Sequence, residues 1–347
     1  MCEVTIAIAS YNVGQYINQC LISVLNQDFE DTEILVCDDC STDNSLQIVE
    51  SIIKSHPKGN KIRIIQLPHN QGTAAIRNLG IDNAKGKYLL FLDGDDYIPE
   101  NAVSVLHKKM IETNADFVMG SHVIFTEDIE SSSADNIKKI YSPYYKTELI
   151  NRPFALAEWM RRLNTDYYPV ALWNKLFKIS FLKQKNIRCI PSHNIIDDIY
   201  FAFQTFIKTD SFAVVSNLTM FWRKREDSAT HMDVKKERVT IYIDIFDTIL
   251  DNILSIRKET HIPVQIYYLI TRRYVSGFIT KNILFSKSLS IKEKKRYLDH
   301  ISVITRIGLK RSEMIGRFNK CCFFALSSKY RFYMMKVLYW LRKKKLI

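Results

Sequence analysis

Acidic side chains gather in two short stretches of this sequence. Asp93, Asp95 and Asp96 come directly after the apolar run "YLLFL", and Asp38 and Asp39 come directly after "EILVC". Carboxylates this close together repel one another, which costs stability unless a cation neutralises them. Mg²⁺ and Mn²⁺ favour carboxylate oxygens and leave coordination positions open for phosphate oxygens. The crowding in "DGDD" therefore predicts a divalent cation, Mn²⁺ or Mg²⁺, that binds a diphosphate, with Asp93, Asp95 and Asp96 as its ligands.

The spacing within "DGDD" suits such a site. Asp93 and Asp95 are expected to point to the same side of an extended chain, and Gly94 leaves room for the close approach of a ligand. The structural alternative is that Asp93 caps the following helix while the other two carboxylates are solvated. For Asp43, which precedes "NSLQIVE", helix capping is the preferred interpretation.

Apolar runs alternate with amphipathic stretches through the first part of the chain. The expected strands are 4–9, 33–37, 62–67, 88–92 and 116–120, and the expected helices between them are 15–25, 43–55, 73–84 and 99–112. This alternation predicts an α/β fold with a doubly wound, mostly parallel sheet flanked by helices. Ligands bind such sheets outside the carboxyl ends of the strands. Ser10 and Asn12 follow the first strand, so we expect them to lie beside the two acidic stretches.

The remaining chain has a looser pattern. Residues 127–138 are expected to form a surface loop, 195–208 a helix, and 211–225 a strand that ends in a basic cluster, while helices alone are expected from residue 235 onward. We therefore divide the chain into a first domain, 1–230, and a helical C-terminal extension, 231–347.

The composition is that of a globular protein of 347 residues, 47% hydrophobic and 25% charged. No stretch reaches the roughly 18 consecutive apolar residues of a membrane span. The start "MCEVTIAIAS" lacks the basic region and cleavage pattern of a leader. The seven cysteines form no even disulfide framework, and the C-x-x-C pair Cys37 and Cys40 lacks a convincing second pair of zinc ligands. A cytoplasmic protein is expected.

Positive charge is concentrated at the end of the chain. The formal net charge is +12, and residues 301–347 hold twelve lysines and arginines against one acid, Glu313. The segment 329–347, "KYRFYMMKVLYWLRKKKLI", is too short and too charged to cross a bilayer. Its aromatic side chains and basic end suit a helix in the interface of an anionic membrane, so we expect peripheral contact with the inner face of the cell membrane. The alternative is a helix whose aromatic side chains pack on the protein body. Nucleic-acid binding is not expected, because no groove-reading motif accompanies the tail.

Several motifs together resemble the family-2 inverting glycosyltransferases of GT-A fold that build bacterial polysaccharides and lipid-linked glycans. The resemblance is carried by "VTIAIASYNVGQYINQC", "EILVCDDCSTDNS" and "NQGTAAIRNLGIDNAKGKYLLFLDGDDYIPE", and more loosely by "WNKLFK", "IIDDIYF" and "FWRKREDSAT". It covers residues 1–230 and makes them a nucleotide-sugar-binding and catalytic domain. It implies transfer of a sugar from a nucleotide-sugar, above all a UDP-sugar, to a hydroxyl of a glycan or lipid-linked glycan acceptor.

The resemblance assigns roles to the matching positions on the donor side. Asp93 and Asp95 match the D-x-D pair that binds the metal and the diphosphate, and Asp96 is a third acid. Asp39 matches the residue that hydrogen-bonds the uracil. The positions that match the nucleotide-binding residues as a group are Ser10, Asn12, Asp38, Asp39, Arg77 and Asn78.

The acceptor side is matched less closely. In "IIDDIYF" the family usually has Glu-Asp where this chain has Asp197 and Asp198. Asp198 resembles the general base, and the departure leaves open which of the two carboxylates is aimed at the acceptor. Inverting transfer needs one carboxylate to take the proton of the acceptor hydroxyl, opposite the leaving group. The positions matched to the diphosphate and acceptor sides are Arg223, Arg225, Ser228 and Trp173.

Three alternatives stay open from the sequence. Trp173 is as well explained as a core residue as it is by an acceptor role. A haloacid-dehalogenase-like phosphatase also places D-x-D after a strand, but it would leave Asp39 without a role. A non-catalytic nucleotide-sugar-binding protein is expected to lose the D-x-D pair or the base, and both are present.

Overall fold

The computed structural model describes residues 2–125, 139–141, 148–151, 171–190, 197–225, 239–260, 283 and 289–301. The chain divides into two compact units, Met1–His231 and Met232–Ile347. The candidate site belongs entirely to the first unit.

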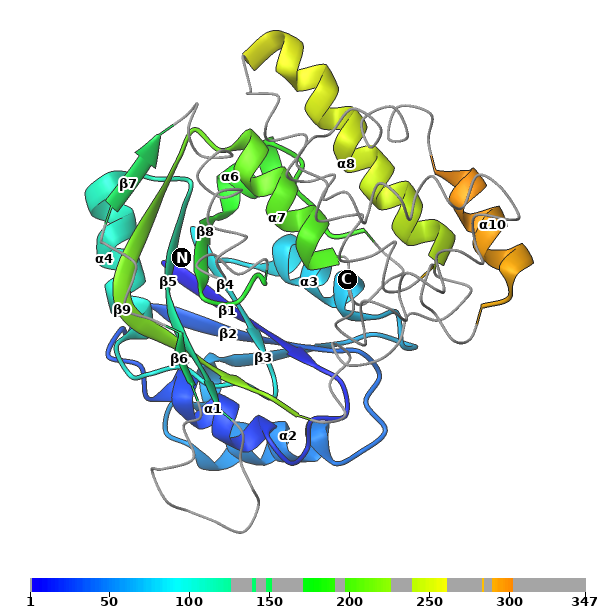
Figure 1. The fold of residues 1–347 in the computed structure, drawn as a ribbon. Coiled ribbons are helices and arrows are strands. Elements are labelled where there is room, and N and C mark those ends of the chain that lie inside the picture. Colours follow the sequence, from blue (N-terminus) through cyan, green and yellow to red (C-terminus); the bar gives the residue numbers. More distant parts are fainter. Residues whose placement is uncertain are drawn as a thin grey trace. The chain divides into compact units, whose positions relative to one another are not determined.

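Nine strands of the described chain form one mixed sheet (Figure 1). Ser10 lies opposite Asp38, and Ala9 lies opposite Asp93, so the carboxyl ends of three parallel strands are level. The register therefore brings the two acidic stretches to one edge, as the sequence predicts. The parallel half of the sheet, in spatial order, is β3 (Ile62–Gln66), β2 (Thr32–Asp38), β1 (Val4–Ser10) and β4 (Tyr88–Asp93).

The other half of the sheet mixes strand directions. β8 is antiparallel to both of its neighbours, β4 and β5, while β5 and β9 are parallel to each other. The sequence predicts β5 and β9 but assigns no element type to the residues of β8. The strands of this half are β8 (Lys175–Lys178), β5 (Phe117–Phe125), β9 (Ser211–Arg223), β7 (Glu148–Asn151) and β6 (Lys139–Tyr141).

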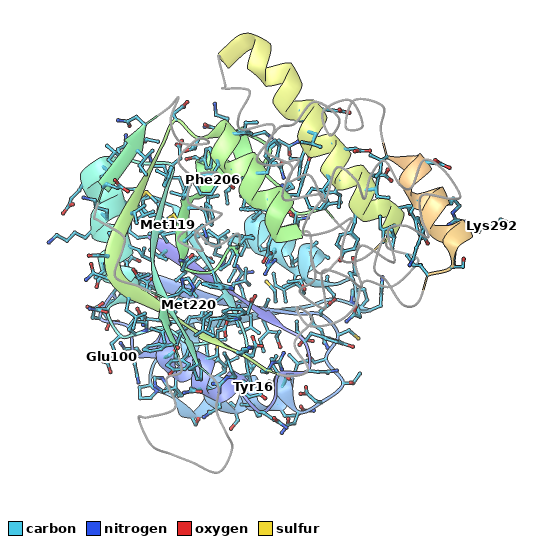
Figure 2. All side chains as sticks on the ribbon, in the orientation of Figure 1. Tyr16, Glu100, Met119, Phe206, Met220 and Lys292 are labelled. Carbon is cyan, nitrogen blue, oxygen red and sulfur yellow. The ribbon has the colours of Figure 1, made fainter. Side chains whose placement is uncertain are left out.

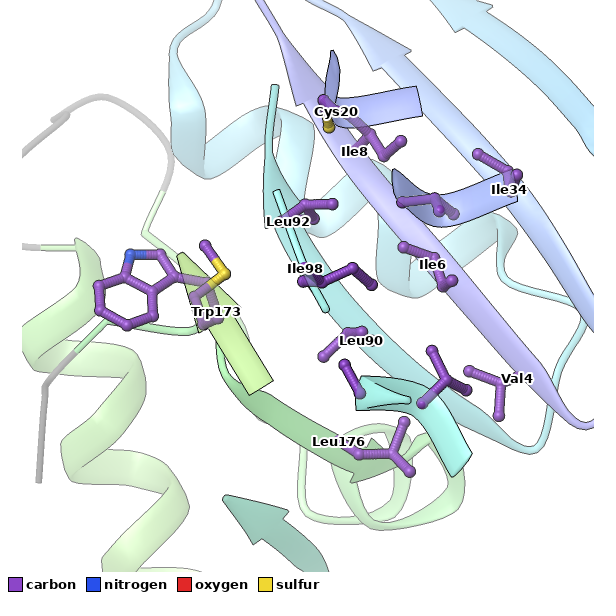
Figure 3. Close-up of a cluster of buried hydrophobic side chains, with 14 of the residues drawn as sticks. Val4, Ile6, Ile8, Cys20, Ile34, Leu90, Leu92, Ile98, Trp173 and Leu176 are labelled. Carbon is purple, nitrogen blue, oxygen red and sulfur yellow. The ribbon is translucent and has the colours of Figure 1, made fainter. Parts of the chain in front are cut away.

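Helices cover both faces of the sheet, because alternate side chains of a strand point to opposite sides. Ile34 of β2 joins a large core cluster that includes Cys20 of α1 (Figure 3). Its neighbour Leu35 packs with Ile76 of α3 on the other face. This two-sided burial confirms the doubly wound architecture. The described helices of the first unit are α1 (Ile17–Leu25), α2 (Ser45–Ser55), the short 3₁₀ helix η1 (Gly59–Lys61), α3 (Thr73–Asn83), α4 (Ala102–Thr113), α6 (Ile179–Gln184) and α7 (Asp197–Lys208).

The second unit is described by two helices, α8 (Val239–Thr260) and α10 (Ile291–His300). Both agree with the helical pattern predicted from residue 235 onward. Among the described helices, none has the length together with the apolar character that crossing a bilayer requires. The basic tail 329–347, the expected loop 127–138 and Ser228 lie outside the described residues.

Candidate functional site

The chain turns sharply at the end of β4. The N–H of Gly94 donates to the carbonyl of Ala9 at 2.8 Å, and the N–H of Asp96 donates to the carbonyl of Asp93 at 3.0 Å. Residues 93–96 are therefore a turn, and the expectation of an extended segment is wrong. The space at Gly94 is also filled by the protein itself, since a Cβ there would lie 2.8 Å from the Ala9 oxygen. Only glycine fits at this position without displacing β1.

The turn directs its three carboxylates toward three different arginines. Asp93 Oδ1 lies 3.5 Å from Nη2 of Arg77 on α3, and Asp95 Oδ2 lies 3.0 Å from Nε of Arg225. Asp96 Oδ1 accepts the backbone N–H of Arg223 at 2.7 Å. The helix-cap alternative for Asp93 is excluded, because α4 begins at Ala102 after its N-cap residue Asn101.

Two carboxyl groups of this turn have a raised pKa despite the nearby arginines. Burial raises the pKa of Asp95 to about 6, and the charge of Asp93 adds to the effect. Burial and the charges of Asp95 and Asp93 raise the pKa of Asp96 well above its usual range. The buried Oδ2 of Asp96 accepts no hydrogen bond.

The donor set of the turn fits a cation that shares its ligands with a substrate. In the described part of the chain, no three His, Cys, Asp or Glu side chains are arranged as a complete metal centre. Mg²⁺ is usually bound by one or two carboxylates together with substrate phosphates and water, rather than by an all-protein cage. The repulsion between these carboxylates and the unpartnered oxygen of Asp96 are what such a cation would relieve.

Two guanidinium groups at the end of β9 pack against the turn. Arg223 Nε donates to the carbonyl oxygen of Asp95 at 2.8 Å, and its Nη2 donates to Oε1 of Gln19. The ring of Tyr16, labelled in Figure 2 at the start of α1, lies 4.8 Å from the guanidinium carbon of Arg223 and 5.2 Å from that of Arg225. Stacking on an aromatic ring holds both cations in place. The sequence pattern does not identify Tyr16 or Gln19; their spacing of three residues on one face of α1 is the signal that could have found them.

Polar side chains after β1 and β2 bind each other and the loop between β2 and α2. Ser10 Oγ donates to Asp38 Oδ1 at 3.1 Å, and Asp38 Oδ2 accepts the N–H of Ser41 at 2.9 Å. Asn12, in the left-handed region with a φ of 51°, accepts the N–H of Thr42 at 2.8 Å through Oδ1. These residues therefore shape the rim of the crevice predicted for the nucleotide, and their direct contact with a nucleotide stays a prediction.

Asp43 has a related structural role. It stands one position before Asn44, the N-cap residue of α2. Its carboxylate accepts the N–H of Ser45 at 2.9 Å and the N–H of Gly14 at 2.8 Å. Asp43 therefore joins the first turn of α2 to the loop after β1 and is not itself the N-cap residue.

Asp39 fixes the start of α3. It is only 3% exposed, and its two carboxylate oxygens accept the N–H groups of Gln71 at 2.7 Å and Gly72 at 2.8 Å. Gly72 directly precedes α3 and has a φ of 86°, a conformation that favours glycine. Arg77 lies in the second turn of α3, so the hydrogen bonds of Asp39 to the start of this helix also help to position Arg77.

Asp39→Asn is expected to lower the free energy of unfolding by about 1–3 kcal/mol, because an amide has one acceptor oxygen and its NH₂ would face a buried N–H. Urea denaturation measures this change. The exposed Asp31→Asn is the matched control and is expected to change stability by less than about 0.5 kcal/mol. Equal urea midpoints for the two variants would contradict a stabilising role for the hydrogen bonds that Asp39 accepts.

Arg77 connects the acidic turn to the predicted base. Its side chain is 7% exposed, and its guanidinium contacts the carboxylates of both Asp93 and Asp198. Asp198 lies in the first turn of α7 with 25% of its side chain exposed, and Asp197 is the first residue of that helix. The side chain of Asp197 lies outside the described residues. Burial raises the pKa of Asp198, and the positive charge of Arg77 opposes the increase.

Asn78, the neighbour of Arg77, binds protein backbone. Its Nδ2 donates to the carbonyl of Cys189 at 2.8 Å, and its Oδ1 accepts the N–H of Cys189 at 3.0 Å. This pairing ties α3 to the segment that leads toward α7. The observed role of Asn78 is therefore to bind the backbone of Cys189, while contact with a nucleotide stays a prediction.

Trp173 is a core residue by its surroundings. It is 6% exposed, belongs to the large hydrophobic cluster, and its ring centroid lies 5.7 Å from that of Trp222 and 5.0 Å from that of His122. Figure 3 shows its ring at the margin of the cluster, while Ile6 and Ile8 lie among the strands. The structure therefore favours the core alternative over contact with an acceptor.

The comparisons with known proteins agree with this geometry. Residues 5–168 match the model of the family described as glycosyl transferase family 2. Residues 5–168 are therefore similar to a family-2 glycosyltransferase domain. Among its relatives, glycosyltransferase GlyG of Streptococcus pneumoniae serotype 4 is 32% identical over 124 residues, which are 36% of this chain and 40% of GlyG. The poly(ribitol-phosphate) beta-glucosyltransferase of Bacillus spizizenii is 26% identical over 303 residues, 86% of this chain and 44% of that protein.

A solved structure extends the family likeness to the fold. The crystal structure of S. aureus TarS 1-349 in complex with UDP-GlcNAc has a TM-score of 0.70 and 20% sequence identity, and the match covers 95% of this chain and 91% of that one. This chain therefore has the same fold as TarS. It spans less than half the length of both curated relatives.

Proposed function

We propose that this protein transfers a sugar from a UDP-sugar to a hydroxyl of a glycan or lipid-linked glycan, with inversion at the anomeric carbon. The observation that carries the proposal is the buried Arg77, whose guanidinium joins Asp93 of the acidic turn to Asp198 on α7. This contact supports a reaction in which the proposed diphosphate site and the proposed base are adjacent, as a single displacement requires. Two similar proteins support the proposed donor and the proposed reaction class. TarS was solved in complex with UDP-GlcNAc, and the Bacillus relative is a glucosyltransferase.

Each side chain has one task in the proposed reaction. Asp198 accepts the proton of the acceptor hydroxyl while the acceptor oxygen bonds to the anomeric carbon and the bond from that carbon to the diphosphate breaks, which releases UDP. Arg223 and Arg225, held by Tyr16, balance the negative charge that grows on the leaving diphosphate. Mn²⁺ or Mg²⁺, when bound at Asp93 and Asp95, adds further positive charge to the same oxygens.

The purified chain with Mn²⁺, offered a panel of sugar nucleotides, tests the proposal through the release of nucleoside diphosphate. We expect UDP from at least one UDP-sugar and no phosphate from p-nitrophenyl phosphate. Phosphate release from the ester would favour the phosphatase alternative. Tight UDP-sugar binding without turnover, in the presence of an acceptor extract, would favour the non-catalytic binding protein.

Peripheral membrane contact through the tail 329–347 is a further part of the proposal, since a lipid-linked acceptor would lie at the same surface. Each basic residue near an anionic bilayer contributes about 1 kcal/mol. We expect the full chain, but not a chain ending at Ser328, to sediment with anionic liposomes at low salt and less at high salt. Equal sedimentation of both chains would show that the tail is not the membrane contact.

A further inference from the structure

A groove opens beside the acidic turn, on the side of α1. It has a volume of about 420 Å³ and is lined by α1, by residues 97–100 and by Phe221 of β9. This volume is within the usual range of sites for small molecules. α1 and α3 cover opposite faces of the sheet, and Asp198 contacts Arg77 of α3. The groove therefore lies on the other side of the turn from the proposed base.

Hydrogen bonds fix the walls of this groove. Gln27, just after α1, is 3% exposed; its Nε2 donates to the carbonyl of Pro99 at 2.8 Å, and its Oε1 accepts the N–H of Val103 at 3.0 Å. Ser23 Oγ accepts the N–H of Ile98 at 3.3 Å. The chain between β4 and α4 is thus tied to α1 by its own contacts. A site that is already formed binds its ligand at a lower cost in entropy.

Two aromatic rings line the groove. Tyr97 and Phe221 stack with their ring centroids 4.5 Å apart and an interplanar angle of 16°. Their backbones are also paired, since the N–H of Phe221 donates to the carbonyl of Tyr97 at 2.9 Å. Both side chains are half-buried, so they present apolar surface to the groove. The C–H face of a sugar ring packs well on rigid aromatic surface of this kind.

The polar side chains of the groove are mainly amides. Asn18 and Asn26 are exposed, and Gln19 lines the same groove. An amide both donates and accepts hydrogen bonds, as the hydroxyl groups of a sugar do. The carboxylate of Glu100, labelled in Figure 2, adds an acceptor. Among the described residues that line the groove, none is a lysine, an arginine or a histidine. The groove therefore suits an uncharged ligand with many hydroxyl groups rather than a phosphate or a nucleotide.

We propose that this groove is a second carbohydrate site, which binds an uncharged glycan through sugar residues remote from the reacting hydroxyl. The inference rests on the proposed function for the source of its ligand, because a glycan acceptor would be present at the neighbouring site. Gln19 connects the two sites, since it lines the groove and its Oε1 accepts a hydrogen bond from Nη2 of Arg223. Two sites on one enzyme keep a long acceptor at a high effective concentration.

Titration with uncharged oligosaccharides, followed by saturation-transfer NMR, tests the inference. The probes are maltohexaose, cellohexaose and chitohexaose, and a heparin hexasaccharide is the anionic control. We expect at least one neutral probe to bind the wild type and to bind Asn18→Ala/Asn26→Ala about tenfold more weakly, because two amide partners are lost. Both asparagines are exposed, so this double variant is expected to fold. Asn60→Ala, the same change at an exposed position of η1, should bind like the wild type.

Equal affinity of the double variant and the wild type, binding of the heparin probe alone, or binding of no probe would overturn the inference. Asp198→Asn should bind the neutral probe as the wild type does. Loss of binding in Asp198→Asn would place the sugar at the proposed base and would also overturn the inference. UDP release by a chain whose groove binds no probe refutes only the inference, whereas probe binding without UDP release refutes only the proposed function.

Discussion

Asp95→Asn is expected to lower kcat/KM by about 10²–10³-fold, the usual cost of losing one electrostatic partner of a leaving group. The carboxylate of Asp95 pairs with Arg225 at 3.0 Å inside the acidic turn. Asparagine keeps the size of the side chain but removes a metal ligand and frees the arginine. Steady-state release of UDP with saturating Mn²⁺ measures the loss, and full activity of the wild type in EDTA would contradict the metal assignment.

Stability measurements separate a metal role from a structural one. The pKa of Asp95 is raised from 3.8 to about 6, so between these values the folded protein binds more protons than the unfolded chain. The stability of the metal-free protein therefore falls as the pH rises through this range. We expect Asp95→Asn to unfold at no lower urea concentration than the wild type at pH 7. Mn²⁺ should raise the midpoint of the wild type and of Asp31→Asn but not that of Asp95→Asn.

Asp198→Asn is expected to lower kcat by about 10²–10⁴-fold, the range for loss of a general base. An amide cannot accept the proton of the acceptor hydroxyl, whereas its oxygen can still accept a hydrogen bond from Arg77. Donor affinity should therefore change little, because the donor side of the site keeps its contacts. Single-turnover transfer and equilibrium binding of UDP, measured on the same preparation, separate the two effects.

Asp197→Asn is the matched control, since it makes the same chemical change one residue earlier in α7. We expect it to retain most of the activity. If Asp197→Asn is the inactive variant and Asp198→Asn the active one, the two carboxylates exchange roles. The wild-type rate should also fall on the acid side of the profile, because a raised pKa leaves Asp198 protonated at a higher pH than an ordinary aspartate.

Local patterns in the sequence were sufficient to predict the parallel half of the sheet and the edge at which the candidate site lies. Continuous apolar strands that alternate with amphipathic helices leave few topologies other than a doubly wound sheet. The carboxyl ends of such strands meet at one edge, which is why Asp38 and Asp93 could be placed together although they are far apart in the chain. The observed register, with Ala9 opposite Asp93 and Ser10 opposite Asp38, agrees with this prediction.

The pairing of individual side chains was decided by the tertiary structure. Arg77 and Asp198 are separated by 121 residues, and Asp96 and Arg223 by 127 residues, so no local period relates them. The sequence pattern also does not predict that β8 lies antiparallel between β4 and β5. A hydrophobic run indicates that a strand is buried but not which strand lies beside it. Long-range packing, which determines which charges lose their water, thus decided which carboxylates and cations act together.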